Sequence, residues 1–92
     1  MELEQLRMFV TVAHSRSISQ AAARLYVSHS TVSRGLAALE AELGVKLVER
    51  DNHVVGLTEA GELLLPRAAQ MLSLAEETER ELHDFALSTK NN

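Results

Sequence analysis

The segment from residue 28 to residue 34 gathers side chains whose chemistry suits contact with nucleic acid. It combines short hydroxyl groups with one imidazole and one guanidinium, while Val32 and Leu36 recur at helical spacing on the opposite side. Small hydroxyl residues let a helix approach a duplex, and imidazole and guanidinium groups donate to guanine or phosphate oxygens. A solvated helix face explains the same pattern, so these residues alone leave two interpretations open. The candidate DNA contacts here are Ser28, His29, Ser30, Thr31, Ser33 and Arg34.

A second functional pattern lies in the last third of the chain, where apolar or small residues recur in alternating steps of four and three. This heptad spacing is typical of a helix that pairs with another helix. Packing on the chain's own domain fits the first two turns, near Leu57, Leu63 and Leu64. Beyond Met71 we expect no core to cover the repeat, which favours a partner chain. The predicted dimerisation seam comprises Leu64, Ala68, Met71, Ala75, Thr78, Leu82 and Phe85.

Patterns for catalysis and metal binding are weak. The four histidines, at positions 14, 29, 53 and 83, are far apart and lack the spacing of metal ligands. The acidic run 76–81 includes Arg80 and fits a solvated helix face better than an acid/base pair. There is no glycine-rich phosphate loop and no serine in a nucleophile elbow. The sequence therefore predicts a protein that is not an enzyme and has no metal or other cofactor.

Three short helices are expected to position the candidate DNA contacts. Apolar residues at steps of three and four predict a first helix over residues 3–14. Ser17 stands three residues before Gln20, as in a capping box, and begins a second helix of about two turns. A third helix over residues 28–43, capped by its first serine, ends at Gly44. Two short helices joined in this way form a helix-turn-helix, whose second helix can enter the major groove.

Two strands and one long helix complete the predicted elements. Residues 46–50 and 54–57 are rich in valine and leucine, and the segment between them suits a tight hairpin, which predicts a small wing. Thr58 caps a helical pattern that extends to about Ser88, too long for a small domain. Because the apolar period continues beyond Pro66, this proline predicts a kink and not a break.

The composition fits one small, mostly helical domain. The chain has 92 residues, of which 46% are hydrophobic and only 3% aromatic. Because it has no cysteine and no apolar run of signal-peptide or membrane-spanning length, we expect a cytoplasmic protein without a membrane partner. The predicted fold is a mostly α winged helix-turn-helix of three helices and a two-stranded wing, followed by a long dimerisation helix. Its predicted parts are a DNA-binding domain (1–58), a linker helix (59–88) and a disordered tail (89–92).

The net charge is the main argument against a DNA-binding protein. The formal charge is −4, which does not suit an approach to phosphates. Residues 1–57, however, hold six basic and six acidic side chains, whereas residues 58–92 hold three basic and seven acidic ones. The acidity belongs to the C-terminal segment, so a nucleic-acid surface must lie before it.

Several short motifs occur together in an order typical of one family. They are Ala21-Ala22 with Leu25, Val32-Ser33-Arg34, Leu39-Glu40 with Leu43-Gly44, Leu47 with Glu49-Arg50, and Leu57 to Gly61. Through these motifs, residues 17–50 and 57–61 resemble the N-terminal domain of LysR-type transcriptional regulators. The resemblance covers essentially the whole chain.

This resemblance implies a winged helix-turn-helix whose third helix reads the major groove and whose wing touches phosphates or the minor groove. It implies double-stranded DNA with an inverted-repeat site as one partner, and a second copy paired through the linker helix as the other. The family usually continues into a C-terminal sensor domain that binds a small inducer, a domain absent from these 92 residues. Further candidate DNA contacts, at the second helix and in the wing, are Ser17, Arg50 and His53.

Four positions depart from the family pattern. His29 and Gly35 stand where glutamine is common, which predicts a different base preference. His53 and Gly56 stand where the wing commonly carries arginine, with Asp51 nearby, which weakens the expected phosphate contact. The alternative function is a dimeric helical adaptor module that has lost DNA binding. An adaptor would expose apolar anchors on its third helix, so the polar residues there favour DNA.

Overall fold

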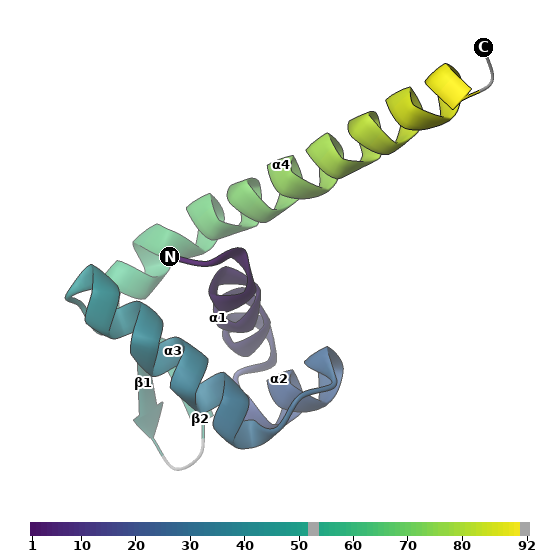
Figure 1. Ribbon diagram of the computed structural model, residues 1–92. Coiled ribbons are helices and arrows are strands. Elements are labelled where there is room, and N and C mark those ends of the chain that lie inside the picture. Colours follow the sequence, from purple (N-terminus) through teal and green to yellow (C-terminus); the bar gives the residue numbers. More distant parts are fainter. Residues whose placement is uncertain (52–53, 91–92) are drawn as a thin grey trace.

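The computed structural model describes residues 1–51 and 54–90 and folds into helices and one β-hairpin (Figure 1). The elements are α1 (Leu3–Ser15), α2 (Ile18–Leu25), α3 (His29–Leu43), β1 (Val48–Asp51), β2 (Val54–Leu57) and α4 (Glu59–Lys90). Figure 1 shows α1 to α3 and the hairpin gathered at one end, while α4 extends away, and the longest dimension is 58 Å. The predicted mostly α winged helix-turn-helix with a long last helix is confirmed. Residues 89 and 90, predicted to be in the disordered tail, are instead the last turn of α4.

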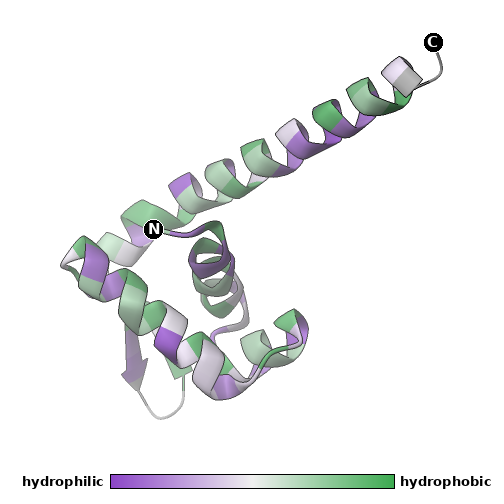
Figure 2. Ribbon diagram, viewed as in Figure 1, coloured by the Kyte–Doolittle hydropathy of each residue, from purple (hydrophilic) through white to green (hydrophobic). Residues whose placement is uncertain are grey.

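The core forms where α1 crosses the other helices. Leu6, Phe9 and Val12 lie on one face of α1 and are at most 1% exposed. Ala68 and Leu72 of α4 are buried in the same cluster, which fixes the first part of the long helix to the domain. Burial of each large apolar side chain stabilises the fold by about 2 kcal/mol. Figure 2 shows hydrophobic and hydrophilic segments alternating along the helices.

The turn between α2 and α3 brings the two helices close together. Ala21 and Ala22 are buried, and their small size allows α2 to approach α3. The helix ends at Tyr26 in the left-handed conformation, with φ 59°, and the N–H of Val27 donates to the carbonyl oxygen of Ala22 (3.1 Å). The Tyr26 side chain is 95% exposed. The left-handed backbone of a non-glycine residue costs about 1 kcal/mol, and packing of this ring does not offset it.

The wing is an antiparallel pair in which Val48 lies opposite Leu57 and Arg50 lies opposite Val55. Val55 is buried, and its N–H donates to the carbonyl oxygen of Arg16 at the end of α1 (3.0 Å). The hairpin is therefore attached to the turn between α1 and α2 on one side, and it carries Arg50 on the other strand.

The first turn of α4 is fixed to the start of the wing. Thr58 Oγ1 accepts from the N–H of Gly61 (3.0 Å) and donates to the carbonyl oxygen of Lys46 (2.6 Å). The N–H of Thr58 donates to the carbonyl oxygen of Leu47 (3.1 Å), and a Cβ on Gly61 would collide with that oxygen. The strand begins at Val48, two residues later than predicted, because the preceding carbonyl groups bond to Thr58 and not to β2.

Candidate nucleic-acid interface

A cluster of hydroxyl groups closes the N-terminus of α3. Ser28 Oγ accepts from the N–H of Thr31 (3.1 Å), which confirms the predicted cap. The same oxygen lies 2.8 Å from Thr31 Oγ1 and 3.2 Å from Ser30 Oγ. The first N–H groups of a helix carry partial positive charge, so this end of α3 favours a nearby phosphate.

The outward face of α3 carries the predicted polar side chains. His29, Ser30 and Arg34 are exposed, and Ser33 is half-buried. Val32 is completely buried on the inner face. This face spans the first two turns of the helix, and an α-helix of this kind fits the major groove of B-form DNA.

The positions that depart from the family pattern lie in different surroundings. Gly35 is half-buried, and a Cβ there would collide with the sulfur atom of Met8 on α1. The position therefore points toward α1, and the effect of Gly35 on base preference stays a prediction. Gly56 lies opposite Glu49 in the hairpin. His53, the predicted contact at the tip of the wing, lies outside the described residues.

A small hollow between α2, α3 and the wing brings three predicted contacts together. Ser17, His29 and Arg50 line this hollow of about 130 Å³. Ser17 caps α2 by accepting a backbone N–H of its first turn (3.2 Å), so the positive end of α2 adds to the guanidinium charge. Ser19, which was not among the predicted contacts, also lines the hollow. Its place in the first turn after the predicted cap Ser17 could have indicated that it lies beside the other contacts.

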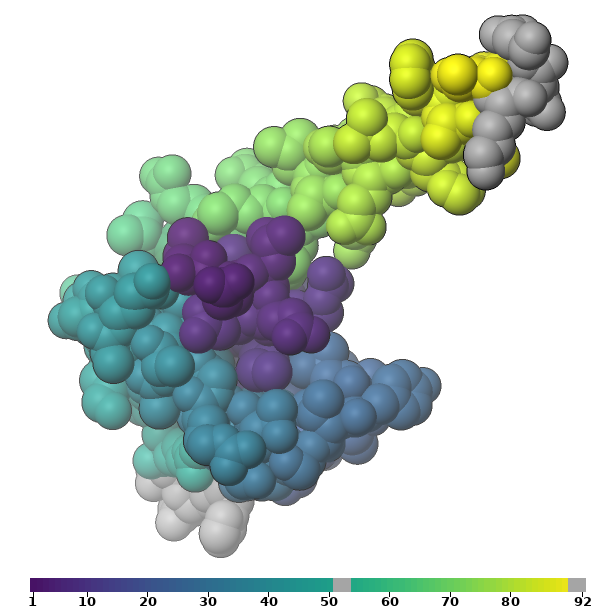
Figure 3. Space-filling view, in the orientation of Figure 1, coloured from purple at the N-terminus to yellow at the C-terminus, as the bar shows by residue number. Residues whose placement is uncertain are grey.

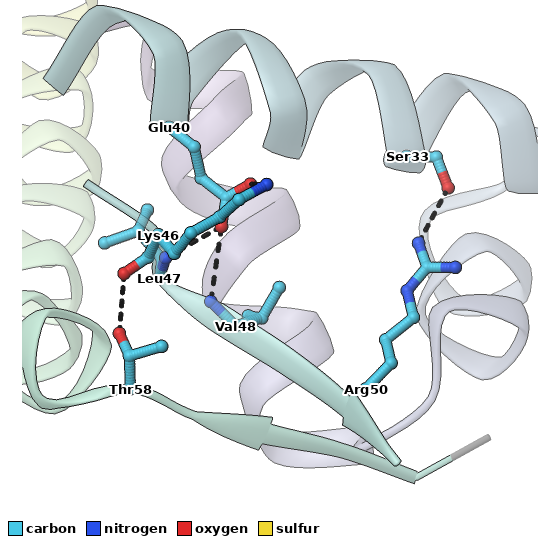
Figure 4. A network of polar contacts seen from close by, with 7 residues as sticks. All are labelled: Ser33, Glu40, Lys46, Leu47, Val48, Arg50 and Thr58. Carbon is cyan, nitrogen blue, oxygen red and sulfur yellow. Dashed lines mark hydrogen bonds and ion pairs between the residues drawn. The ribbon is translucent and has the colours of Figure 1, made fainter. Parts of the chain in front are cut away.

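Strand β1 is attached to α3 at two points (Figure 4). Toward the start of the helix, Arg50 Nη2 donates to Ser33 Oγ (3.3 Å). Toward its end, Glu40 Oε2 accepts from the N–H groups of Leu47 (2.7 Å) and Val48 (3.3 Å). Between these points the helix and strand border a groove of about 680 Å³. In the sequence, Glu40 stands out only as part of a family motif, and no function was predicted for it.

The structure divides the predicted dimerisation seam into two parts. Ala68 is completely buried in the core of its own chain, so its assignment to a partner interface is wrong. Leu64 and Met71 are half-buried against the same core. Leu72 is only 8% exposed, so the core extends one residue beyond the expected limit at Met71.

The rest of the seam lies on the part of α4 that stands clear of the domain (Figure 3). Ala75 is half-buried, whereas Thr78, Leu82 and Phe85 are exposed. Three leucines of α4 outside the predicted seam are also exposed, Leu63 by 64%, Leu74 by 63% and Leu87 by 49%, so the expectation that Leu63 packs on its own domain is wrong. At about 100° per residue, Leu63, Leu74, Leu82 and Phe85 share one side of the helix, whereas Leu87 lies on another. We define the outer stripe of α4 as Leu63, Arg67, Leu74, Thr78, Leu82 and Phe85.

Other classes of site find no support in the part of the chain that the structure describes. Across residues 1–51 and 54–90, no group of three or more histidine or acidic side chains is arranged to hold a metal ion. Within the same residues, no helix combines the length and apolar character needed to cross a membrane. The outward face of α3, with the adjoining hollow and wing, is therefore the candidate site.

Comparison with known proteins matches this geometry. The family model "Bacterial regulatory helix-turn-helix protein, lysR family" matches residues 3–62. An uncharacterized HTH-type transcriptional regulator of Azotobacter vinelandii is 45% identical over 85 residues, covering 92% of this chain and 59% of the relative. The HTH-type transcriptional regulator TcbR of Pseudomonas sp. is 44% identical over 75 residues, covering 82% of this chain and 26% of the relative. The chain thus spans between about a quarter and three-fifths of the length of these relatives.

Solved structures give the same assignment over nearly the whole chain. The chain in the crystal structure of the CbnR_DBD–DNA complex is 40% identical, with a TM-score of 0.87 and coverage of 94% of this chain and 99% of that one. The chain in the BenM_DBD complex with catB site 1 DNA is 34% identical, with a TM-score of 0.89 and coverage of 94% and 96%. With its three-helix core, wing and long last helix, this chain belongs to the LysR family of bacterial helix-turn-helix regulators.

Proposed function

We propose that this chain binds double-stranded DNA with sequence specificity, as the DNA-binding domain of a LysR-type transcription regulator. The observation that carries the proposal is the outward face of α3, where His29, Ser30 and Arg34 are exposed beside the Ser33–Arg50 contact. The similarity to chains solved in complexes with DNA supports it.

Each part of the candidate site has a role in this proposal. The N-terminal turns of α3 enter the major groove, where Arg34 donates to guanine or phosphate oxygens and the Thr31 methyl group meets a thymine methyl. The hollow lined by Ser17, His29 and Arg50 faces the sugar–phosphate backbone, where a cation and a helix N-terminus both favour an anion. The acidic side chains of α4 lie mainly beyond the domain and so do not oppose this contact.

A dimeric adaptor that has lost DNA binding is the alternative. Its support is the exposed pair in the turn before α3, Tyr26 (95%) and Val27 (38%), which offers an apolar contact for another protein. The outward face of α3, however, is polar, whereas an adaptor that bound its partner through this helix would expose apolar side chains there. We therefore favour DNA binding.

The proposed protein partner is a second copy bound through the outer stripe of α4. Leu74, Leu82 and Phe85 are each more than 60% exposed, and a surface of this kind on a projecting helix is stabilised by pairing. The relevant interface is the outer stripe, which shares Thr78, Leu82 and Phe85 with the predicted seam but leaves out Ala68, because Ala68 is buried in its own domain.

Charge favours an antiparallel arrangement of the two α4 helices. The segment 76–84 holds five acidic side chains and Arg80, so a parallel pair would place two acidic segments side by side. An antiparallel pair places this segment against the earlier half of the partner helix, where Arg67 lies on the outer stripe. The two winged domains then lie at opposite ends of the pair, and a two-fold dimer matches an inverted-repeat site.

The remaining parts of the proposal concern the whole protein. In this proposal the DNA-binding domain (1–58), gathered at one end of the molecule in Figure 1, contacts DNA. The linker helix (59–88), which extends away from it, contacts the second copy. A sensor domain that binds a small inducer would follow these residues, since the relatives are longer than this chain. A regulator that binds chromosomal DNA acts in the bacterial cytoplasm.

Titration with duplex DNA at two salt concentrations tests the function directly. A labelled random-sequence duplex of about 30 base pairs should bind in about 50 mM salt and bind more weakly in about 200 mM salt. With Arg34 and Arg50 supplied twice per dimer, we expect log affinity to fall with log salt with a slope of roughly −2 to −4. Absence of binding at the lower salt concentration would contradict DNA binding and favour the adaptor.

A further inference from the structure

We propose that Glu40 is a positioning residue for DNA binding, which holds strand β1 so that Arg50 faces the duplex. This inference rests on the proposed DNA-binding function. Glu40 itself does not touch DNA in this proposal. Its removal should weaken DNA binding, whereas the loss of a negative charge alone would strengthen it.

The Glu40 carboxylate connects α3 to the wing. Its side chain is only 11% exposed, and Oε2 accepts two consecutive backbone N–H groups, from Leu47 (2.7 Å) and Val48 (3.3 Å). Its other oxygen, Oε1, lies 3.7 Å from Lys46 Nζ. Hydrogen bonds to a charged acceptor are stronger than neutral ones, so this residue fixes the start of the strand firmly.

Few other contacts hold β1 against α3. Figure 4 shows the strand crossing beside the helix, with polar contacts at Glu40 and at Ser33, which are about 10 Å apart along the helix axis. The groove of about 680 Å³ lies between these contacts, so continuous apolar packing does not set the spacing of helix and strand. On the other side, Thr58 bonds to the carbonyl groups of Lys46 and Leu47 and fixes the same segment to α4.

Arg50 depends on this attachment. It lies two residues after Val48 on a strand of four residues, and its guanidinium reaches Ser33 Oγ at 3.3 Å. If the Glu40 contacts are lost, the start of β1 stays attached to α4 through Thr58 and the buried Leu47, but its polar contact with α3 is gone. Arg50 then loses its fixed place beside Ser33 and the hollow lined by Ser17 and His29. A displacement of about 1 Å is enough to weaken a directional phosphate contact.

The test is a double-mutant cycle on DNA affinity, measured with the random-sequence duplex under conditions where every variant is folded by circular dichroism. Glu40→Ala and Arg50→Ala should each weaken binding by about tenfold, and the double variant should be little weaker than either single one. Because loss of an acidic side chain by itself strengthens DNA binding, a weakening in Glu40→Ala reports lost positioning. The control is Glu42→Ala, which removes an exposed carboxylate from the same helix and should bind at least as tightly as the parent.

Several results would overturn the inference. Equal or tighter binding by Glu40→Ala, or losses that multiply in the double variant, would show that Glu40 does not act through Arg50. If Glu40→Ala does not fold, Glu40→Gln takes its place, because its amide oxygen still accepts from the strand while the carboxylate charge is gone. We expect a loss of about twofold to threefold for that variant, which disappears in the Arg50→Ala background. Failure of the parent chain to bind would instead contradict the proposed function.

Discussion

Replacement of Leu74 by glutamate is expected to convert the dimer into a monomer. Leu74 lies near the middle of the outer stripe and is 63% exposed in the single chain, so the substitution leaves the core intact. In the dimer each copy would lose a buried leucine and place an unpaired carboxylate at the interface. We expect the dimer dissociation constant to rise by about 100-fold or more, measured by analytical ultracentrifugation over a concentration series.

Ala69→Glu is the matched control, because it also adds one negative charge to an exposed position of α4. At about 100° per residue, Ala69 lies roughly 140° around the helix axis from Leu74 and so faces away from the outer stripe. That variant should dimerise like the parent. A Leu74→Glu chain that remains a stable dimer would show that the outer stripe is not the interface.

Replacement of Arg34 by alanine is expected to weaken DNA binding by about 1 to 3 kcal/mol, which is roughly fivefold to 150-fold. Arg34 is an exposed cation on the first two turns of α3, next to the half-buried Ser33. In the proposed complex its guanidinium donates to guanine or phosphate oxygens, and alanine cannot replace these bonds. Because Arg34 has no place in the core, thermal unfolding should be nearly unchanged.

The control for Arg34 is Arg80→Ala, which removes the same charge from the exposed far part of α4. Its effect on affinity should be less than about twofold, because Arg80 lies on α4 and not on the outward face of α3 or the wing. Similar losses in both variants would mean that only net charge matters and that α3 has no special role.

Local sequence signals were sufficient to predict most of the fold. The caps at Ser17, Ser28 and Thr58 and the stop at Gly44 each depend on residues within one turn. Because each of these signals acts within its own helix turn, the residue type at that position is enough to predict it. The long helix also continues through Pro66, as the uninterrupted apolar period predicted.

The partner-facing side of α4 could not be predicted from periodicity alone. Apolar residues occur on more than one side of this helix, and Ala68 and Leu74 fit similar repeats. The crossing of α1 decides between them, since it buries Ala68 completely and leaves Leu74 exposed. That crossing joins segments about 60 residues apart, and a heptad pattern within one helix contains no information about it.

The wing attachment was missed for a similar reason. Glu40 is a polar residue in a helix. Its neighbours in the sequence do not show that one oxygen of its carboxylate accepts from backbone N–H groups seven and eight residues later. Gly35 illustrates the reverse case, because it follows two outward residues but faces Met8. Which side of α3 a residue occupies was predictable only where strongly apolar residues marked the core.

Selection from a pool of random DNA duplexes can show whether two copies of this chain present two α3 helices to one duplex. We expect the chain to enrich an inverted repeat whose half-sites lie about one helical turn, or a multiple of it, apart. The Arg34→Ala chain should fail to enrich that motif under the same conditions. No enrichment, or enrichment of a single unrepeated half-site, would show that two copies do not bind one duplex in this way.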